Sequence, residues 1–99
     1  TFRSKYRAAD IEKKKNSSVP GCLFEISKRD EKKLDVYEDF PTLYKKYYFK
    51  HYGKKVMTYT MVEKSPFMFP TKRYLNIVNQ GYKDCKLDKK YLKIALSNI

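Results

Sequence analysis

The chain has 99 residues, of which 41% are apolar and 16% aromatic. This length predicts one small domain spanning residues 1–99, and this composition excludes a disordered chain despite its many charges. Lys and Arg number 23 against 11 Asp and Glu, and the resulting formal charge of +12 would attract polyanions through a salt-sensitive field.

The cysteine and histidine content argues against several classes of protein. Cys22 and Cys85 are too few for a disulfide framework and lie in no CxxC motif, so we expect two reduced, apolar side chains in a cytoplasmic protein. With His51 as the one histidine, we expect no metal site. No apolar run approaches the roughly 20 residues of a membrane span, and the first residues carry no signal-peptide core, so we expect no membrane association.

Two strands are predicted in the first quarter of the chain. Apolar and charged residues alternate from Phe2 to Ile11, which is typical of a half-buried strand. Residues 12–18 are charged and then polar, and they predict a loop that runs to Pro20-Gly21. A second strand is expected over Cys22–Ile26, with alternate apolar residues on one face.

A helix is predicted to follow directly. Ser27 and Asp30 have the spacing of a capping box, so the helix should begin there. Leu34 and Tyr37, three residues apart, should supply its buried stripe. Phe40-Pro41 should end it, because the residue before a proline is disfavoured in the α region.

The second half of the chain predicts a hairpin and two helices. Segments 44–52 and 55–62 are rich in β-formers and flank Gly53, which predicts a hairpin turn there. A helical pattern then continues from Tyr74 until Gly81, which we expect at the C′ position. A last helix should start near Asp88, a good N-cap, and pack on the sheet through one apolar face, formed by Tyr91, Leu92, Ala95, Leu96 and Ile99. The order of elements predicts the α+β class.

Four segments, taken together, resemble a known family. They are Leu34-Asp35-x-Tyr37-Glu38-x-x-Pro41-x-x-Tyr44, Val56–Tyr59, Pro70-x-x-x-Tyr74-x-x-Ile77-x-x-x-Gly81 and Leu87-x-x-x-Tyr91. Their order and spacing are similar to the C-terminal two-thirds of gamma-glutamylcyclotransferase-like proteins.

The resemblance implies a fold and a reaction. The fold would be a small mixed β-barrel or strongly curved sheet with helices packed outside. The reaction would be the cyclisation of a small γ-glutamyl compound to 5-oxoproline, with release of an amine or amino acid and without a cofactor. Glu38 falls at the position of the family's catalytic glutamate, and Tyr44, Tyr59 and Tyr74 fall where its site tyrosines lie.

The chain also departs from the family pattern. The family begins with a strand and a Tyr-Gly-Ser loop whose backbone N–H groups hold the substrate, whereas none of the three glycines here is followed by Ser. We therefore expect an N-terminally truncated domain with doubtful activity, and self-association through the sheet edge that the missing strand would leave exposed. Asp39 stands where many relatives have glycine.

An alternative interpretation is a non-catalytic basic module that binds nucleic acid or a protein partner. The run Lys45-Lys46-Tyr47-Tyr48-Phe49-Lys50 interleaves cations with aromatic rings, as a stacking platform requires. However, a strand period of two would send Tyr47 and Phe49 to one face and Tyr48 and Lys50 to the other. Nucleic acid is for this reason the less favoured partner.

Overall fold

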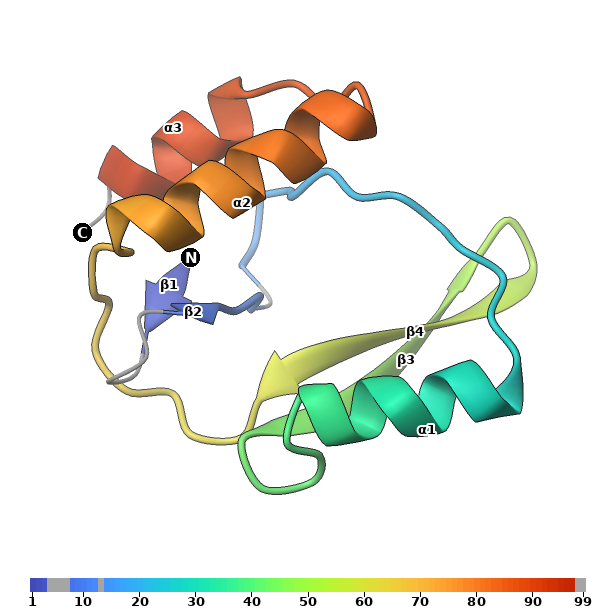
Figure 1. The fold of residues 1–99 in the computed structure, drawn as a ribbon. Coiled ribbons are helices and arrows are strands. Elements are labelled where there is room, and N and C mark those ends of the chain that lie inside the picture. The colour runs from blue at the N-terminus through green and yellow to red at the C-terminus, as the bar shows by residue number, and fades with distance from the viewer. Residues whose placement is uncertain (4–7, 13, 98–99) are drawn as a thin grey trace. The chain divides into compact units, whose positions relative to one another are not determined.

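The computed structural model describes residues 1–3, 8–12 and 14–97, and they form an α+β fold (Figure 1). The chain divides into two compact units. The terminal unit, Thr1–Leu23 with Lys64–Ile99, contains β1 (Phe2–Arg3), β2 (Ala8–Ala9), α2 (Lys72–Asp84) and α3 (Lys90–Ser97). The hairpin unit, Phe24–Glu63, contains α1 (Lys28–Tyr37), β3 (Tyr44–His51) and β4 (Lys54–Met61).

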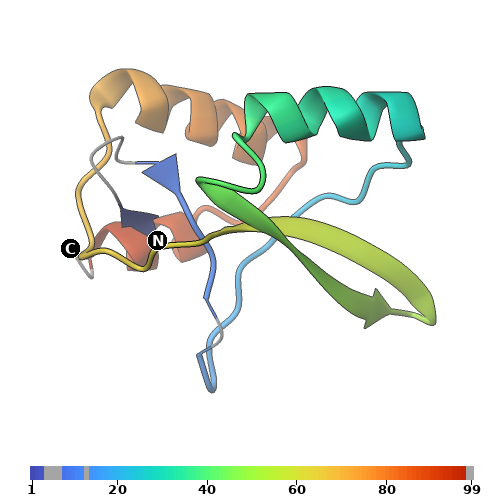
Figure 2. The ribbon, with the colours of Figure 1, turned by 90° about the horizontal axis from the view of Figure 1, so that it is seen from below.

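The β3–β4 hairpin is the longest sheet structure in the described part of the chain, and it confirms the predicted hairpin. Its antiparallel register runs from Tyr44 opposite Met61 to His51 opposite Lys54. Tyr52 and Gly53 form the connection and both have positive φ, 48° and 77°, as a two-residue type I′ turn requires. Figure 2 shows the twist of the two strands, which such turns match.

One face of this hairpin lies against α1. The Lys46 ammonium contacts the carboxylates of Glu31 at 2.6 Å and Asp35 at 3.0 Å, and the Tyr59 hydroxyl donates to Asp35 at 2.6 Å. Lys46 and Tyr59 are opposite one another in the register. Since side chains alternate along a strand, the even-numbered residues of β3 therefore face α1 and the odd-numbered residues face away from it.

The start of α1 confirms the predicted cap, because the Ser27 hydroxyl accepts a hydrogen bond from the Asp30 N–H at 3.1 Å. Its end was predicted less well. The helix stops at Tyr37 in a Schellman motif. The Phe40 N–H donates to the Asp35 carbonyl at 2.8 Å, and Asp39, at the C′ position, is left-handed. The expected buried stripe is wrong, since Leu34 is 36% and Tyr37 84% exposed.

In the terminal unit, the single strand predicted over Phe2–Ile11 is wrong. Phe2–Arg3 and Ala8–Ala9 are two short antiparallel strands, with Phe2 opposite Ala9. The Phe2 carbonyl accepts a hydrogen bond from the Met68 N–H at 2.9 Å, which joins β1 to the segment before α2. Residues 4–7 of the prediction lie outside the described residues.

The strand predicted over Cys22–Ile26 is also wrong. This segment forms neither helix nor strand, and Leu23 and Phe24 are 62% and 77% exposed. The alternation of apolar residues was therefore misleading here, because no neighbouring strand among the described residues pairs with the segment.

Helix α2 begins at the Thr71 cap, whose hydroxyl accepts from the Tyr74 N–H at 3.3 Å. It passes through Gly81 and ends at Asp84, so the expected C′ role of Gly81 is wrong. A second Schellman motif ends the helix. Lys86 has a φ of 54°, and the N–H of the following Leu87 donates to the Tyr82 carbonyl at 2.8 Å.

Helix α3 follows after a short connection, in agreement with the prediction. The Asp88 carboxylate accepts from the Lys90 N–H at 2.9 Å, which confirms the expected cap. Leu92 is the buried residue of the helix. Ile99, expected on the same apolar face, lies outside the described residues.

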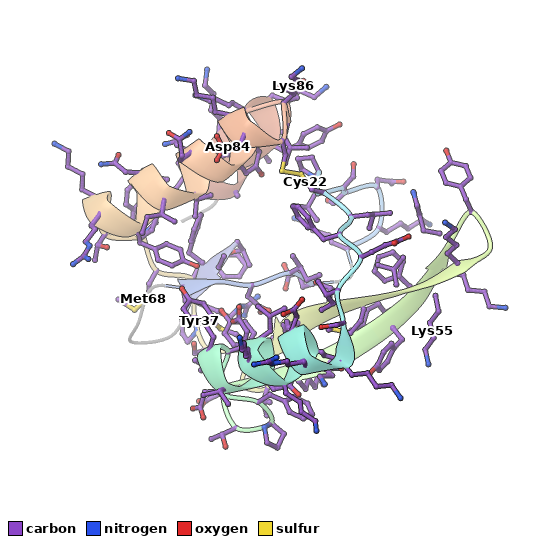
Figure 3. All side chains as sticks on the ribbon, turned by 45° about the vertical axis from the view of Figure 1, so that its right-hand side comes forward. Cys22, Tyr37, Lys55, Met68, Asp84 and Lys86 are labelled. Carbon is purple, nitrogen blue, oxygen red and sulfur yellow. A yellow bond between two sulfur atoms is a disulfide. The ribbon has the colours of Figure 1, made fainter. Side chains whose placement is uncertain are left out.

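Cys22 and Cys85 form a disulfide within the terminal unit, visible at Cys22 in Figure 3. The expectation of two reduced cysteines is therefore wrong. The two residues are 63 positions apart in sequence, and only the fold brings their Cα atoms to 6.3 Å, a normal separation for a disulfide.

The described residues form no closed barrel. They contain two sheets of two strands each, β1–β2 and β3–β4. The large apolar side chains that are buried among them are Phe2, Tyr44, Met61 and Leu92. In the same described ranges, no helix is both long and apolar enough to cross a membrane.

Candidate functional site

Glu38, the predicted catalytic residue, is the C-cap of α1 in the hairpin unit. Its backbone N–H donates to the Leu34 carbonyl at 2.8 Å, which holds the residue against the last turn of the helix. The residue is half-buried, and burial raises the pKa of its carboxyl above the usual value for glutamate. A carboxyl with a raised pKa is better matched to proton transfer near neutral pH than a fully solvated one.

A charged network lies one turn earlier on the same helix, and of its members only Tyr59 was predicted as a site residue. It joins Asp35 to Tyr59 and Lys46, with Glu31 as a second carboxylate on Lys46. The hydrogen bond from Tyr59, followed by the Lys46 ammonium, lowers the pKa of Asp35. Burial, and then the Asp35 carboxylate, raises the pKa of Tyr59, so its phenol stays protonated and remains a hydrogen-bond donor.

The predicted site tyrosines are divided between the two units. Tyr44 and Tyr59 belong to β3 and β4 of the hairpin unit, which also contains Glu38. Tyr44 is 7% exposed and lies opposite Met61 in the strand register, while the Tyr59 hydroxyl donates a hydrogen bond to Asp35. The structure thus places three of the four predicted residues in one unit.

Tyr74 belongs to α2 of the terminal unit and has structural contacts there. Its hydroxyl accepts a hydrogen bond from the Ala9 N–H at 3.1 Å. Its ring packs edge-on against Phe2, with ring centroids 6.2 Å apart. These contacts connect α2 to the β1–β2 pair.

The terminal unit also contains a cavity that no pattern in the sequence predicted. It has a volume of about 590 Å³ and an apolar wall that includes Phe2, Val78, Tyr82 and Leu92. None of the four predicted site residues lines it.

The buried carboxylate at this cavity is already paired. Asp10 lines the wall and is 3% exposed, with the Arg3 guanidinium at 3.0 Å and the Lys64 ammonium at 2.7 Å. Two cations at hydrogen-bond distance compensate for the cost of burying its charge, which gives Asp10 a structural role. The signal in the sequence was a lone aspartate after an apolar pair, which is too weak to predict this pairing.

In the described part of the chain, no three His, Cys, Asp or Glu side chains are grouped so as to hold a metal ion. Comparison with known protein families, with curated proteins and with solved structures finds no match to this chain.

Proposed function

We propose that this chain is a gamma-glutamylcyclotransferase-like protein in which Glu38 acts as the general acid and base. The observation that carries the proposal is the position of Glu38. It is a half-buried carboxyl with a raised pKa at the end of α1, within the motif that runs from Leu34 to Tyr44. The other resembling segments support the same assignment.

The chemistry requires a group such as Glu38. An α-ammonium is not a nucleophile until it loses a proton, which the carboxylate would accept. The freed amine attacks the side-chain carbonyl carbon of the same γ-glutamyl group and forms the new ring bond between carbon and nitrogen. The bond to the leaving amine then breaks as its nitrogen takes the proton from Glu38. The ring nitrogen loses a second proton, which passes to the leaving amine, so that the amine departs as an ammonium. Atoms and charges balance without a cofactor, and such a base typically contributes 10²–10⁴-fold in rate, by order of magnitude.

The conformation at Asp39 supports this assignment. Many relatives have glycine at this position, and Asp39 has a φ of 51°, in the left-handed region that favours glycine. Aspartate tolerates this region better than most residues. The departure from the family pattern at Asp39 is thus compatible with the turn that such a glycine would make beside Glu38.

Within the proposal, Tyr59 and Tyr44 of the hairpin unit would bind the γ-glutamyl substrate. Tyr59 has the best defined geometry for this role, since its hydroxyl donates to Asp35 and keeps its oxygen lone pairs for a substrate ammonium. Tyr44 is assigned to the site by the resemblance alone, and Tyr74, which contacts Ala9 and Phe2 in the terminal unit, is not included in the proposed site.

The experiment that tests the proposal is release of 5-oxoproline from a γ-glutamyl dipeptide. It should compare these 99 residues with a longer chain that includes any coding sequence preceding them. We expect activity in the longer chain and activity lower by about 10²–10³-fold in the shorter one, the usual cost of losing an oxyanion donor. Absence of 5-oxoproline in both would overturn the proposal.

A further inference from the structure

We propose that the face of the β3–β4 hairpin directed away from α1 binds single-stranded nucleic acid, with bases stacked on Tyr47 and Phe49 and phosphates held by the lysines beside them. This inference is independent of the proposed cyclotransferase activity and rests on other residues.

The charge of the hairpin favours an anionic partner. From Tyr44 to Val62 the sequence contains five lysines and no acidic residue. Of these, Lys46 is on the α1 side and is already paired with Glu31 and Asp35. The remaining lysines of the hairpin are Lys45, Lys50, Lys54 and Lys55.

The face directed away from α1 combines aromatic rings with cations. Tyr47 and Phe49 are two residues apart on β3, so they share this face. Their rings lie 6.2 Å apart between centroids at an interplanar angle of 26°, and their exposed fractions are 38% and 39%. Lys45 precedes the rings on the same face, and Lys54 follows them across the register from His51.

This arrangement fits a single strand better than other polyanions. Nearly parallel, partly exposed rings offer flat surfaces on which unpaired bases can stack, while the bases of a duplex are already stacked on each other. Cations before and after the rings can neutralise the phosphates that flank the stacked bases. Recognition of this kind tolerates any sequence, because every base has a flat face.

The opposite face of the same hairpin supplies a matched control. Tyr48 is adjacent to Tyr47 in sequence and is 48% exposed, but it is directed to the α1 side. The ammonium of Lys55, labelled in Figure 3, lies 4.4 Å from the centroid of the Tyr48 ring and occupies the position that a base would need. Removing Tyr48 should therefore leave nucleic-acid binding unchanged.

The test is fluorescence anisotropy with a labelled oligothymidylate of about twelve nucleotides, within the range of usual single-strand sites. We expect Tyr47→Ala to weaken binding by about 5- to 100-fold, the loss that corresponds to one stacked base. Tyr47→Phe, which keeps the ring, and Tyr48→Ala should each stay within about twofold of the wild type. Lys54→Gln should reduce the slope of log affinity against log salt by about 0.7, the loss of one phosphate contact to a single strand.

Competition experiments distinguish single-stranded nucleic acid from other polyanions. Inorganic polyphosphate and anionic lipid vesicles carry charge without bases, so they should compete weakly and without sensitivity to Tyr47→Ala. The proposal is overturned if the oligothymidylate does not bind at physiological salt. It is also overturned if Tyr47→Ala and Tyr48→Ala have equal effects, or if vesicles bind and the oligothymidylate does not.

Discussion

Asp35 shows how a single carboxylate connects two elements of the hairpin unit. It accepts hydrogen bonds from Tyr59 at 2.6 Å and Lys46 at 3.0 Å, and these partners come from opposite strands of the hairpin. A charged acceptor makes stronger hydrogen bonds than a neutral one. We infer that the charge on Asp35, more than apolar contact, holds α1 to the sheet, because the helix itself buries no residue.

The first prediction concerns the pH dependence of this contact. The pKa of Asp35 is lowered in the folded protein from its ordinary value of 3.8, so the unfolded chain binds more protons in acid. The stabilisation is complete above about pH 4 to 5 and is lost as the pH falls through the lower folded pKa. Asp35→Asn should thus lower the free energy of unfolding at neutral pH, and the difference from the wild type should shrink towards about pH 2.

Urea denaturation at both pH values measures this difference. The matched control is Asp88→Asn, because asparagine caps α3 as well as aspartate does, and the ion pair of Asp88 with Lys90 at 3.8 Å is exposed and contributes little to stability. An Asp35→Asn penalty that is the same at both pH values would contradict the account.

At the scale of elements, the two longer helices end in the same way although their sequences differ. Both have a left-handed residue at C′, Asp39 after α1 and Lys86 after α2. In each, the N–H of the next residue donates back to the carbonyl at C3. Neither position is glycine, and the glycine that does lie near the end of α2, Gly81, is inside the helix.

The second prediction therefore uses two glycines with opposite expectations. Gly81→Ala should raise the free energy of unfolding by about 0.5–1 kcal/mol, since alanine is the better helix former and its Cβ meets no atom within 4 Å. Gly53→Ala should lower it by about 1–2 kcal/mol, because a φ of 77° is unfavourable for a residue with a Cβ.

Urea denaturation of both variants shows whether α2 ends at Asp84, as in the structure, or at Gly81, as its sequence pattern predicts. If Gly81→Ala destabilised the protein as much as Gly53→Ala, Gly81 would be a left-handed C′ residue, as its sequence pattern suggests, and α2 would end there.

The features that could be predicted from the sequence are those set by neighbouring residues. The caps at Ser27 and Asp88 and the turn at Gly53 each depend on a few adjacent side chains, and all three were recognisable. The end of α2 was not, because lysine at a left-handed position carries no signal in the sequence.

The candidate site likewise has one part that the sequence could predict and one part that it could not. Glu38 could be selected from its motif, and its burial is compatible with the selected role. The hydrogen bonds from Tyr59 and Lys46 to Asp35 could not be predicted, because they depend on how α1 packs on the hairpin. The helical spacing of Leu34 and Tyr37 instead suggested an apolar contact, and both side chains are exposed.

At the scale of the whole molecule, the disulfide is a covalent constraint on the terminal unit. It joins the segment after the first loop to the C-cap of α2 and closes a loop of 63 residues. Chain-entropy arguments assign about 4 kcal/mol to a loop of this length. Disulfides persist in oxidising compartments, so a cytoplasmic location stays a prediction that the thiol state would test.

The third prediction follows from this constraint. Reduction should lower the free energy of unfolding by about 2–5 kcal/mol, as is usual for a small domain that loses its disulfide. Thermal denaturation with and without a phosphine reductant measures the effect. A Cys22→Ala, Cys85→Ala double variant should show the lower stability in both conditions. Two thiols titrated in the unfolded protein without reductant would contradict the account.

The measurement that most directly tests the central proposal is the kcat for 5-oxoproline release by Glu38→Gln in the active form of the chain. Glutamine keeps the size of the side chain but cannot accept the proton, so we expect kcat to fall by about 10²–10⁴-fold. The control is Asp39→Asn, which removes the adjacent charge and keeps the left-handed turn, and it should stay within a few-fold of the wild type. A Glu38→Gln variant within about tenfold of the wild type would contradict the role of Glu38 as the proton acceptor.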